Sequence, residues 1–120
     1  MNSNIKVAFD CIGCLVDYQG NPNDEIISAF HLFKNLGCDV IVWNTEGCAD
    51  NFLKKLCLTA RVIKKGSEAV DIAFDDMPNW LKLIDAKVKF LVGDGKKPDD
   101  TWKIINRLTE LGYLDGGSDL

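Results

Sequence analysis

The sequence predicts an α/β domain, a Rossmann-like three-layer sandwich in which a mostly parallel central sheet lies between layers of helices. Apolar runs of strand length alternate with stretches of helical periodicity along the 120 residues, and this alternation is typical of parallel strands joined by right-handed crossovers. Two of the apolar runs end abruptly in carboxylates, at Asp10 and at Asp75 with Asp76. The length is usual for one domain, so we expect residues 1–120 to form a single unit.

The first half of the chain is expected to form two strands and two helices. In order, the predicted strand, loop, helix, strand and helix cover residues 5–10, 11–23, 24–36, 39–43 and 46–58. Asp24 is expected to cap the first helix and Gly37 to end it. Apolar residues recur at helical spacing in both helices: they are Ile26, Ile27, Phe30 and Phe33 in the first, and Phe52, Leu53, Leu56 and Cys57 in the second.

The second half continues the alternation and supplies the second acidic strand end. Predicted strands cover residues 60–63, 70–74 and 88–92, and predicted helices cover 79–85 and 99–112. Ligands of open α/β sheets bind outside the carboxyl ends of the strands. If the strands 5–10 and 70–74 lie side by side, Asp10, Asp75 and Asp76 meet at that edge of the sheet.

Three carboxylates that lie so close repel one another unless a proton or a cation sits between them. A hard divalent ion such as Mg²⁺, which prefers oxygen ligands, is the natural partner. The acidic pair could instead cap the helix predicted at 79–85, since Met77 and Pro78 follow it, and a cap is compatible with metal binding.

Composition limits the expected binding partners and the expected cellular location of the protein. The net charge of −4 argues against nucleic acid as a partner, because nucleic-acid-binding domains are usually basic. The sequence holds no apolar run of membrane-spanning length. Residues 1–6 lack the basic region and the apolar stretch of a signal peptide. We therefore expect a cytoplasmic protein with no membrane association.

The five cysteines give a weaker signal. The spacing of Cys11 and Cys14 would suit a redox couple or half of a zinc site. A thioredoxin-like site needs a helix beginning at the first cysteine, whereas Gly20 and Pro22 make the following segment a loop. The sequence also has no second closely spaced Cys/His pair, so redox and zinc chemistry are disfavoured.

Four segments resemble the motifs of the haloacid dehalogenase (HAD) superfamily, and they occur in the family's order within residues 5–92. Residues 9–17 resemble the first motif, which is an apolar strand, Asp, any residue, usually Asp, and then Gly-Thr-Leu. Residues 40–45 are placed like the second motif, 64–67 precede the fourth as the third-motif lysine should, and 71–76 resemble the fourth motif, which ends in Asp-Asp. The resemblance implies a HAD-like fold.

The resemblance also implies roles for individual residues. Asp10 would be the nucleophile that accepts a phosphoryl group from a phosphorylated small molecule or macromolecule, with Lys65 offsetting the negative charge. Mg²⁺ would be bound by Asp10, Asp75, Asp76 and the backbone carbonyl of Ile12. The phosphate would be bound by Asn44, Thr45 and Lys64, and the sequence leaves open which of the two adjacent lysines faces the site.

Departures from the family pattern limit the expected activity. Ile12 stands where the family's phosphatases carry a second Asp as general acid and base, and Cys14 replaces the motif's Thr. We therefore expect a phosphohydrolase of weak activity. The alternative is a catalytically inactive HAD-like module that binds a partner, an anion or a metal. A receiver-type phosphoacceptor domain is disfavoured, because its acidic pair would follow the first strand.

The loop 11–23 is too short to hold a cap domain, the insertion that selects substrates in many HAD enzymes. We expect an open site, which suits a phosphorylated macromolecule or a substrate covered by a second subunit of an oligomer.

Overall fold

The computed structural model describes residues 5–44, 47–92 and 101–112 of the chain, without the side chains of 101–105. The strands are β1 (Lys6–Phe9), β2 (Asp39–Trp43), β3 (Arg61–Ile63), β4 (Val70–Asp75) and β5 (Ala86–Leu91), and the helices are α1 (Asp24–Asn35), α2 (Ala49–Leu56), α3 (Pro78–Leu83) and α4 (Thr101–Glu110). They follow the predicted order, and their ends differ from the predicted ones by at most three residues. Among the described residues, no helix combines the length and the apolar character that crossing a bilayer requires.

The central sheet has five strands, all parallel, in the order β3-β2-β1-β4-β5. This confirms the predicted α/β fold. β1 lies in the middle, with Phe9 opposite Val42 on β2 and opposite Phe74 on β4. The chain passes from one side of β1 to the other between β3 and β4. Ligands of open α/β sheets bind at such switch points, so we expect a binding site at the carboxyl end of β1.

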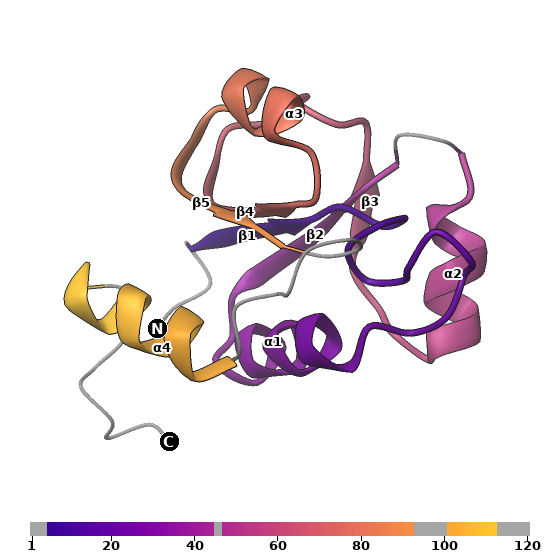
Figure 1. Cartoon of the computed structure of the whole chain (residues 1–120), viewed down its shortest axis with the longest axis horizontal. Coiled ribbons are helices and arrows are strands. Elements are labelled where there is room, and N and C mark those ends of the chain that lie inside the picture. The colour runs from indigo at the N-terminus through magenta and orange to yellow at the C-terminus, as the bar shows by residue number, and fades with distance from the viewer. Residues whose placement is uncertain (1–4, 45–46, 93–100, 113–120) are drawn as a thin grey trace.

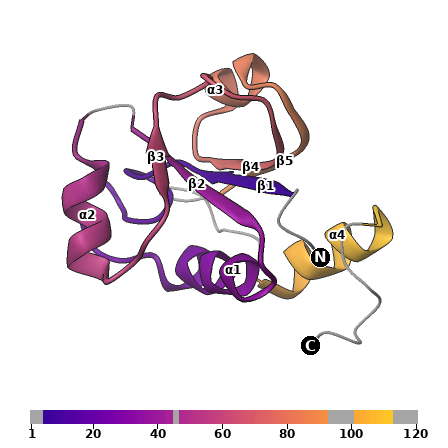
Figure 2. The same cartoon turned by 180° about the vertical axis from the view of Figure 1, so that it is seen from behind.

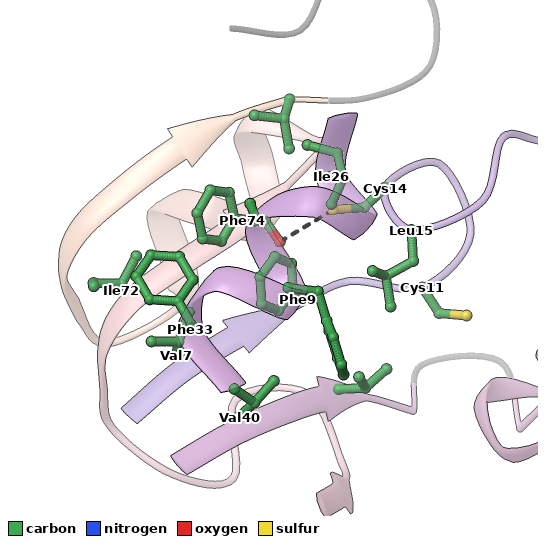
Figure 3. Packing of buried hydrophobic residues seen from close by; sticks show 14 of the residues in the cluster. Val7, Phe9, Cys11, Cys14, Leu15, Ile26, Phe33, Val40, Ile72 and Phe74 are labelled. Carbon is green, nitrogen blue, oxygen red and sulfur yellow. Dashed lines mark hydrogen bonds between the residues drawn. The ribbon is translucent and has the colours of Figure 1, made fainter. Parts of the chain in front are cut away.

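Helices cover both faces of the sheet. In Figures 1 and 2, α3 lies on one side of the strands, and α1 and α4 lie on the other. Successive side chains of a strand face opposite layers. Val7 and Phe9 accordingly join the larger apolar cluster on the α1 side, whereas Ala8 joins a smaller cluster with Leu81 of α3. Figure 3 shows the larger cluster, in which the rings of Phe9 and Phe74 stack with their centroids 4.6 Å apart.

Two predictions about helix ends are wrong. Asp24 is the first residue of α1 and not its cap; Asn23 occupies the cap position, without a side-chain capping bond to the described backbone. Cys57 was expected on the apolar stripe of the second helix, but it follows α2, is exposed, and has a φ of 56°. Gly37 does end α1 as predicted, with a φ of 82°, which glycine adopts without strain.

The segment 11–23 is a loop, as predicted, and its two cysteines are buried. The sulfur of Cys14 points toward the backbone carbonyl of Phe74, with Sγ 3.9 Å from the oxygen, and the sulfur of Cys11 points elsewhere (Figure 3). Burial raises the pKa of the Cys14 thiol well above its usual value, so the thiol stays protonated and unreactive. Both cysteines belong to the larger apolar cluster.

Candidate functional site

The carboxyl ends of the three central strands bring functional side chains into one row. β2 and β4 keep register with β1 through Phe9, so the residues one step further along, Asp10, Trp43 and Asp75, are neighbours across the sheet. The backbone N–H of Asp10 donates a hydrogen bond to the carbonyl of Phe74 at 3.0 Å, which extends the ladder past the end of β1. The residues two positions earlier on these strands belong to the apolar cluster on the α3 side. Because side chains alternate along a strand, the row faces the same layer.

Three carboxylates meet at this end of the sheet, as the two acidic strand ends predict. Asp10, Asp75 and Asp76 each place a carboxylate oxygen within 4.8 Å of the others. Their exposed fractions are only 7%, 0% and 8%. Water therefore screens their repulsion poorly, and a proton or a cation has to offset it.

Lys65 provides a positive charge at this point. Its Nζ atom lies 2.6 Å from Oδ2 of Asp75 and 3.2 Å from Oδ1 of Asp10, and its side chain is 5% exposed. Nζ also lies 4.8 Å from the centre of the Trp80 ring, in cation–π geometry. Lys64, the other candidate lysine, is exposed. The structure thus brings Lys65 into the cluster and leaves Lys64 in solvent.

The electrostatic balance at the cluster remains negative. Burial, and next the charge of Asp75, raise the pKa of Asp10 to about 7, although Lys65 acts in the opposite direction. Burial also raises the pKa of Asp75, against the hydrogen bonds that this carboxylate accepts from Lys65 and from the backbone N–H of Met77. One ammonium group does not neutralise three carboxylates. A further cation would therefore be attracted to this position.

The loop that follows β1 holds Asp76 from outside the sheet. Gly13 has a φ of 88°, and a Cβ atom at this residue would lie 2.3 Å from Oδ2 of Asp76. Only glycine lets the backbone approach the carboxylate so closely. The hydroxyl of Tyr18, further along the loop, donates a hydrogen bond to the same oxygen. The glycine is part of the first-motif resemblance, whereas no sequence pattern points to Tyr18.

Asp75 also organises the start of α3. Its Oδ1 atom accepts a hydrogen bond from the backbone N–H of Met77 at 3.0 Å, while its Oδ2 atom contacts Lys65. The capping position of α3 is Met77, so this bond stabilises the turn before the helix and does not cap the helix itself. The turn and the cluster use different oxygens of one carboxylate, and the two roles are compatible.

A pocket of about 50 Å³ opens at the row. This volume accommodates a few water molecules or a group of phosphate size. Asp10, Asp76 and Lys65 line it together with Ile12, Trp43 and Asn44, and Met77 and Trp80 add apolar surface. The side chains of Met77 and Trp80 are themselves 48% and 38% exposed. The sequence analysis assigned neither Trp43 nor Trp80 to the site.

The predicted phosphate-binding residues are placed unequally. Asn44 lines the pocket, and its Oδ1 atom accepts a hydrogen bond from the backbone N–H of Ala49 at 3.4 Å. This bond leaves the amide NH₂ group to donate elsewhere. Thr45 lies outside the described residues. Lys64 is not among the residues that line the pocket.

Comparison of the chain with models of protein families, with curated proteins and with solved structures finds no match. The chemistry of the site therefore has to be argued from its own groups. Those groups are the carboxylate of Asp10 at the strand end, the two further carboxylates of Asp75 and Asp76, the buried ammonium group of Lys65, and the amide of Asn44. Together they could bind a divalent cation and an anion side by side.

Proposed function

We propose that the protein is a HAD-like, Mg²⁺-dependent phosphohydrolase in which Asp10 is the nucleophile. One observation carries the proposal. Asp10, Asp75 and Asp76 each place a carboxylate oxygen within 4.8 Å of the others, Lys65 contacts the first two of them, and Asp10, Asp76 and Lys65 line the pocket at the end of the central strand. A strand-end carboxylate next to a cation site is what an attack on a phosphate ester requires, since both reacting groups are negative.

The donor set suits the proposed ion. The three side chains offer only oxygen ligands, which Mg²⁺ prefers over nitrogen and sulfur. Asp10, Asp75 and Asp76 would hold the ion together with the backbone carbonyl of Ile12, a residue that lines the same pocket. Bound there, Mg²⁺ would supply the positive charge that lets a carboxylate and a phosphate approach each other.

The chain's own residues would carry out two steps. In the first, a carboxylate oxygen of Asp10 attacks phosphorus, and the leaving-group oxygen departs with the electrons of its bond. In the second, water attacks the aspartyl-phosphate, loses a proton to solvent, and restores the Asp10 carboxylate as phosphate leaves. Lys65 would hold Asp10 in position and offset negative charge, while Asn44 would donate its amide hydrogens to the phosphate.

Ile12 limits the rate in this scheme. Ile12 lines the pocket, but its side chain cannot give a proton to the leaving group or take one from water. General acid–base catalysis contributes roughly a hundred- to ten-thousandfold in rate. We therefore expect slow turnover that favours aryl phosphates, whose leaving groups depart without protonation, over alkyl phosphates. Ile12→Asp should raise the rate on alkyl phosphates in particular.

The test compares three proteins on p-nitrophenyl phosphate, with millimolar Mg²⁺ and with a chelator. The wild type is expected to turn over slowly and only with Mg²⁺, and Asp10→Asn is expected to be inactive while melting cooperatively. Asp50→Asn is the matched control, because Asp50 is an exposed residue on α2, and it should keep wild-type activity. Equal rates for Asp10→Asn and the wild type would refute the nucleophile.

The presence of Ile12 favours one other function, that of an inactive module that binds a metal or an anion at the same pocket. Thermal melts separate the two functions, because a ligand that binds only the folded state raises the melting temperature. A melting temperature that rises with Mg²⁺ or with beryllium fluoride, in a protein that hydrolyses no aryl phosphate, would support the binding module. A stabilising effect of equal size in Asp75→Ala would exclude the metal site for both functions.

A further inference from the structure

Trp43 is an unusual component of the pocket wall. Its side chain is fully buried, with an exposed fraction of 0%. Its indole Nε1 is a buried side-chain polar atom that lacks a hydrogen-bond partner among the described residues. An unpaired donor in the interior loses its hydration and gains nothing in return, and native proteins pair nearly all such groups. A hydrogen-bond acceptor placed against the indole N–H of Trp43 would therefore be stabilising.

The position of Trp43 indicates where that acceptor would come from. Trp43 ends β2, directly beside Asp10 in the row across the sheet. Trp43 packs with Ala8 and Leu81 in the apolar cluster on the α3 side, and it is also one of the residues that line the pocket. The side chains of that cluster carry no acceptor, whereas the pocket is a polar surface that Trp43 borders.

The polar groups of the pocket fall into hydrogen-bond acceptors and hydrogen-bond donors. Asp10 and Asp76 present acceptor oxygens, as carboxylates do. The last residue of β2 and the residue after it both line the pocket and both carry donors: Trp43 has the unpaired Nε1, and Asn44 has an amide NH₂ whose oxygen accepts a hydrogen bond from the backbone N–H of Ala49. A ligand that satisfies these donors must carry acceptor oxygens.

We propose that the indole N–H of Trp43 is a ligand-binding donor that holds an oxyanion oxygen in the pocket. The ligand class is a tetrahedral oxyanion, with inorganic phosphate or a phosphoryl group as the expected member. This inference rests on the proposed function for the identity of the ligand, but it does not require turnover. Trp43 would act as a positioning residue: it fixes the phosphoryl oxygen while the carboxylates hold the cation.

The experiment measures phosphate binding directly. The chain has three tryptophans, so its ¹H–¹⁵N spectrum holds three indole signals, and the signal missing in Trp43→Phe belongs to Trp43. On titration of the Mg²⁺-loaded protein with inorganic phosphate, the Trp43 signal is expected to shift and to saturate. Trp43→Phe is expected to bind phosphate roughly 10- to 100-fold more weakly in calorimetry, as loss of a hydrogen bond to a charged acceptor implies.

A second variant separates the lost donor from lost packing. Ile41 lies on the same strand and in the same apolar cluster, is fully buried, and carries no polar side-chain atom. Ile41→Val should lower the melting temperature and leave phosphate affinity within about twofold of the wild type. Equal losses of affinity in Ile41→Val and Trp43→Phe would attribute the effect to packing and overturn the proposal.

The remaining outcomes are also decisive. A Trp43 signal that stays fixed while calorimetry reports phosphate binding would mean that another group pairs with the indole, and the proposal fails. Absence of phosphate binding at tens of millimolar would overturn it as well. A shifted signal in a protein without phosphatase activity would support the proposal and refute the hydrolase. Turnover of aryl phosphates with a KM that Trp43→Phe does not raise would support the hydrolase and refute the role of Trp43.

Discussion

The Nζ atom of Lys65 lies 2.6 Å from Oδ2 of Asp75, and both side chains are almost completely buried. Asp75 is the last residue of β4, and Lys65 lies in the turn that follows β3. β1 and β2 lie between those strands. The ion pair therefore joins parts of the sheet that do not hydrogen-bond to each other, directly over the end of the central strand. Loss of either partner should affect both the stability and the metal dependence of the protein.

The first prediction concerns this ion pair. Lys65→Met should lower the free energy of unfolding by roughly 3 kcal/mol at neutral pH without metal, because it leaves buried carboxylates without a compensating charge. Urea melts in a chelator measure the loss. Lys64→Met is the control, since Lys64 is exposed, and it should stay within about 0.5 kcal/mol of the wild type. Millimolar Mg²⁺ should reduce the deficit of Lys65→Met, and a deficit that Mg²⁺ leaves unchanged would contradict a cation site at the cluster.

The second prediction concerns the contact between Gly13 and Asp76. Gly13→Ala adds a Cβ atom 2.3 Å from the carboxylate, in a residue with a φ of 88°. Gly37→Ala has a similar φ of 82°, but its Cβ atom meets nothing within 4 Å. The control should lose about 1 kcal/mol through backbone strain alone, whereas Gly13→Ala should lose roughly 2–4 kcal/mol, since overpacking adds to the strain. Gly13→Ala should also lose stabilisation by Mg²⁺, and equal effects of the two variants would refute the close approach.

The third prediction concerns the charge of Asp10. Its pKa is about 7 in the folded protein, against 3.8 as its ordinary value, so the folded state binds more protons than the unfolded state between these pH values. The stability contribution of Asp10 is fully present below pH 3.8 and is lost as pH rises through 7. Asp10→Asn, which stays uncharged, should therefore be more stable than the metal-free wild type at pH 8 by roughly 1–3 kcal/mol. The gain should vanish near pH 4, and a pH-independent difference in chelator-containing urea melts would be inconsistent with a destabilising charge.

The fourth prediction concerns the opposite end of the sheet. Arg61 of β3 donates hydrogen bonds to Asp39 and to Glu68, and the bonds to Glu68 are the main reason why the pKa of Glu68 falls from 4.5 to about 2. The stabilising effect of Glu68 should be present above pH 4.5 and should disappear as pH falls through 2. Wild type and Glu68→Gln should accordingly differ in melting temperature at pH 7, and converge toward pH 2. High salt should also reduce the difference, because the groups are exposed; a difference insensitive to both would point to packing.

Most of the fold could be predicted from the sequence, because it depends on patterns that lie within short segments of the chain. Apolar runs, helical spacing and glycine at a helix end identify the elements, and the carboxylates at two strand ends anticipate the meeting of Asp10 with Asp75. The choice between Lys64 and Lys65 could not be predicted, since it depends on where β3 ends: Lys65 lies two residues after Ile63 and shares its side of the strand.

Aromatic residues were the other limit of sequence reasoning. An indole ring in an apolar run favours packing, and Trp43 does pack in a core cluster. Its placement in the pocket depends on the strand register, which brings the end of β2 next to the end of β1. Tyr18 reaches Asp76 from a loop whose path depends on the φ of Gly13. Such contacts join segments that are distant in sequence, and local periodicity carries no information about them.

The central place of β1 in the strand order has a consequence for how the protein is made. The ribosome synthesises Asp10 before β2 and β3, and it synthesises Asp75 and Asp76, at the end of β4, only after them. Until then β1 has one open edge, and parallel pairings between such distant segments form slowly. Any cation that needs all three carboxylates can bind only after β4 has docked. Such a cation would not assist the first steps of folding. It would instead stabilise only those molecules in which β4 has already joined the sheet.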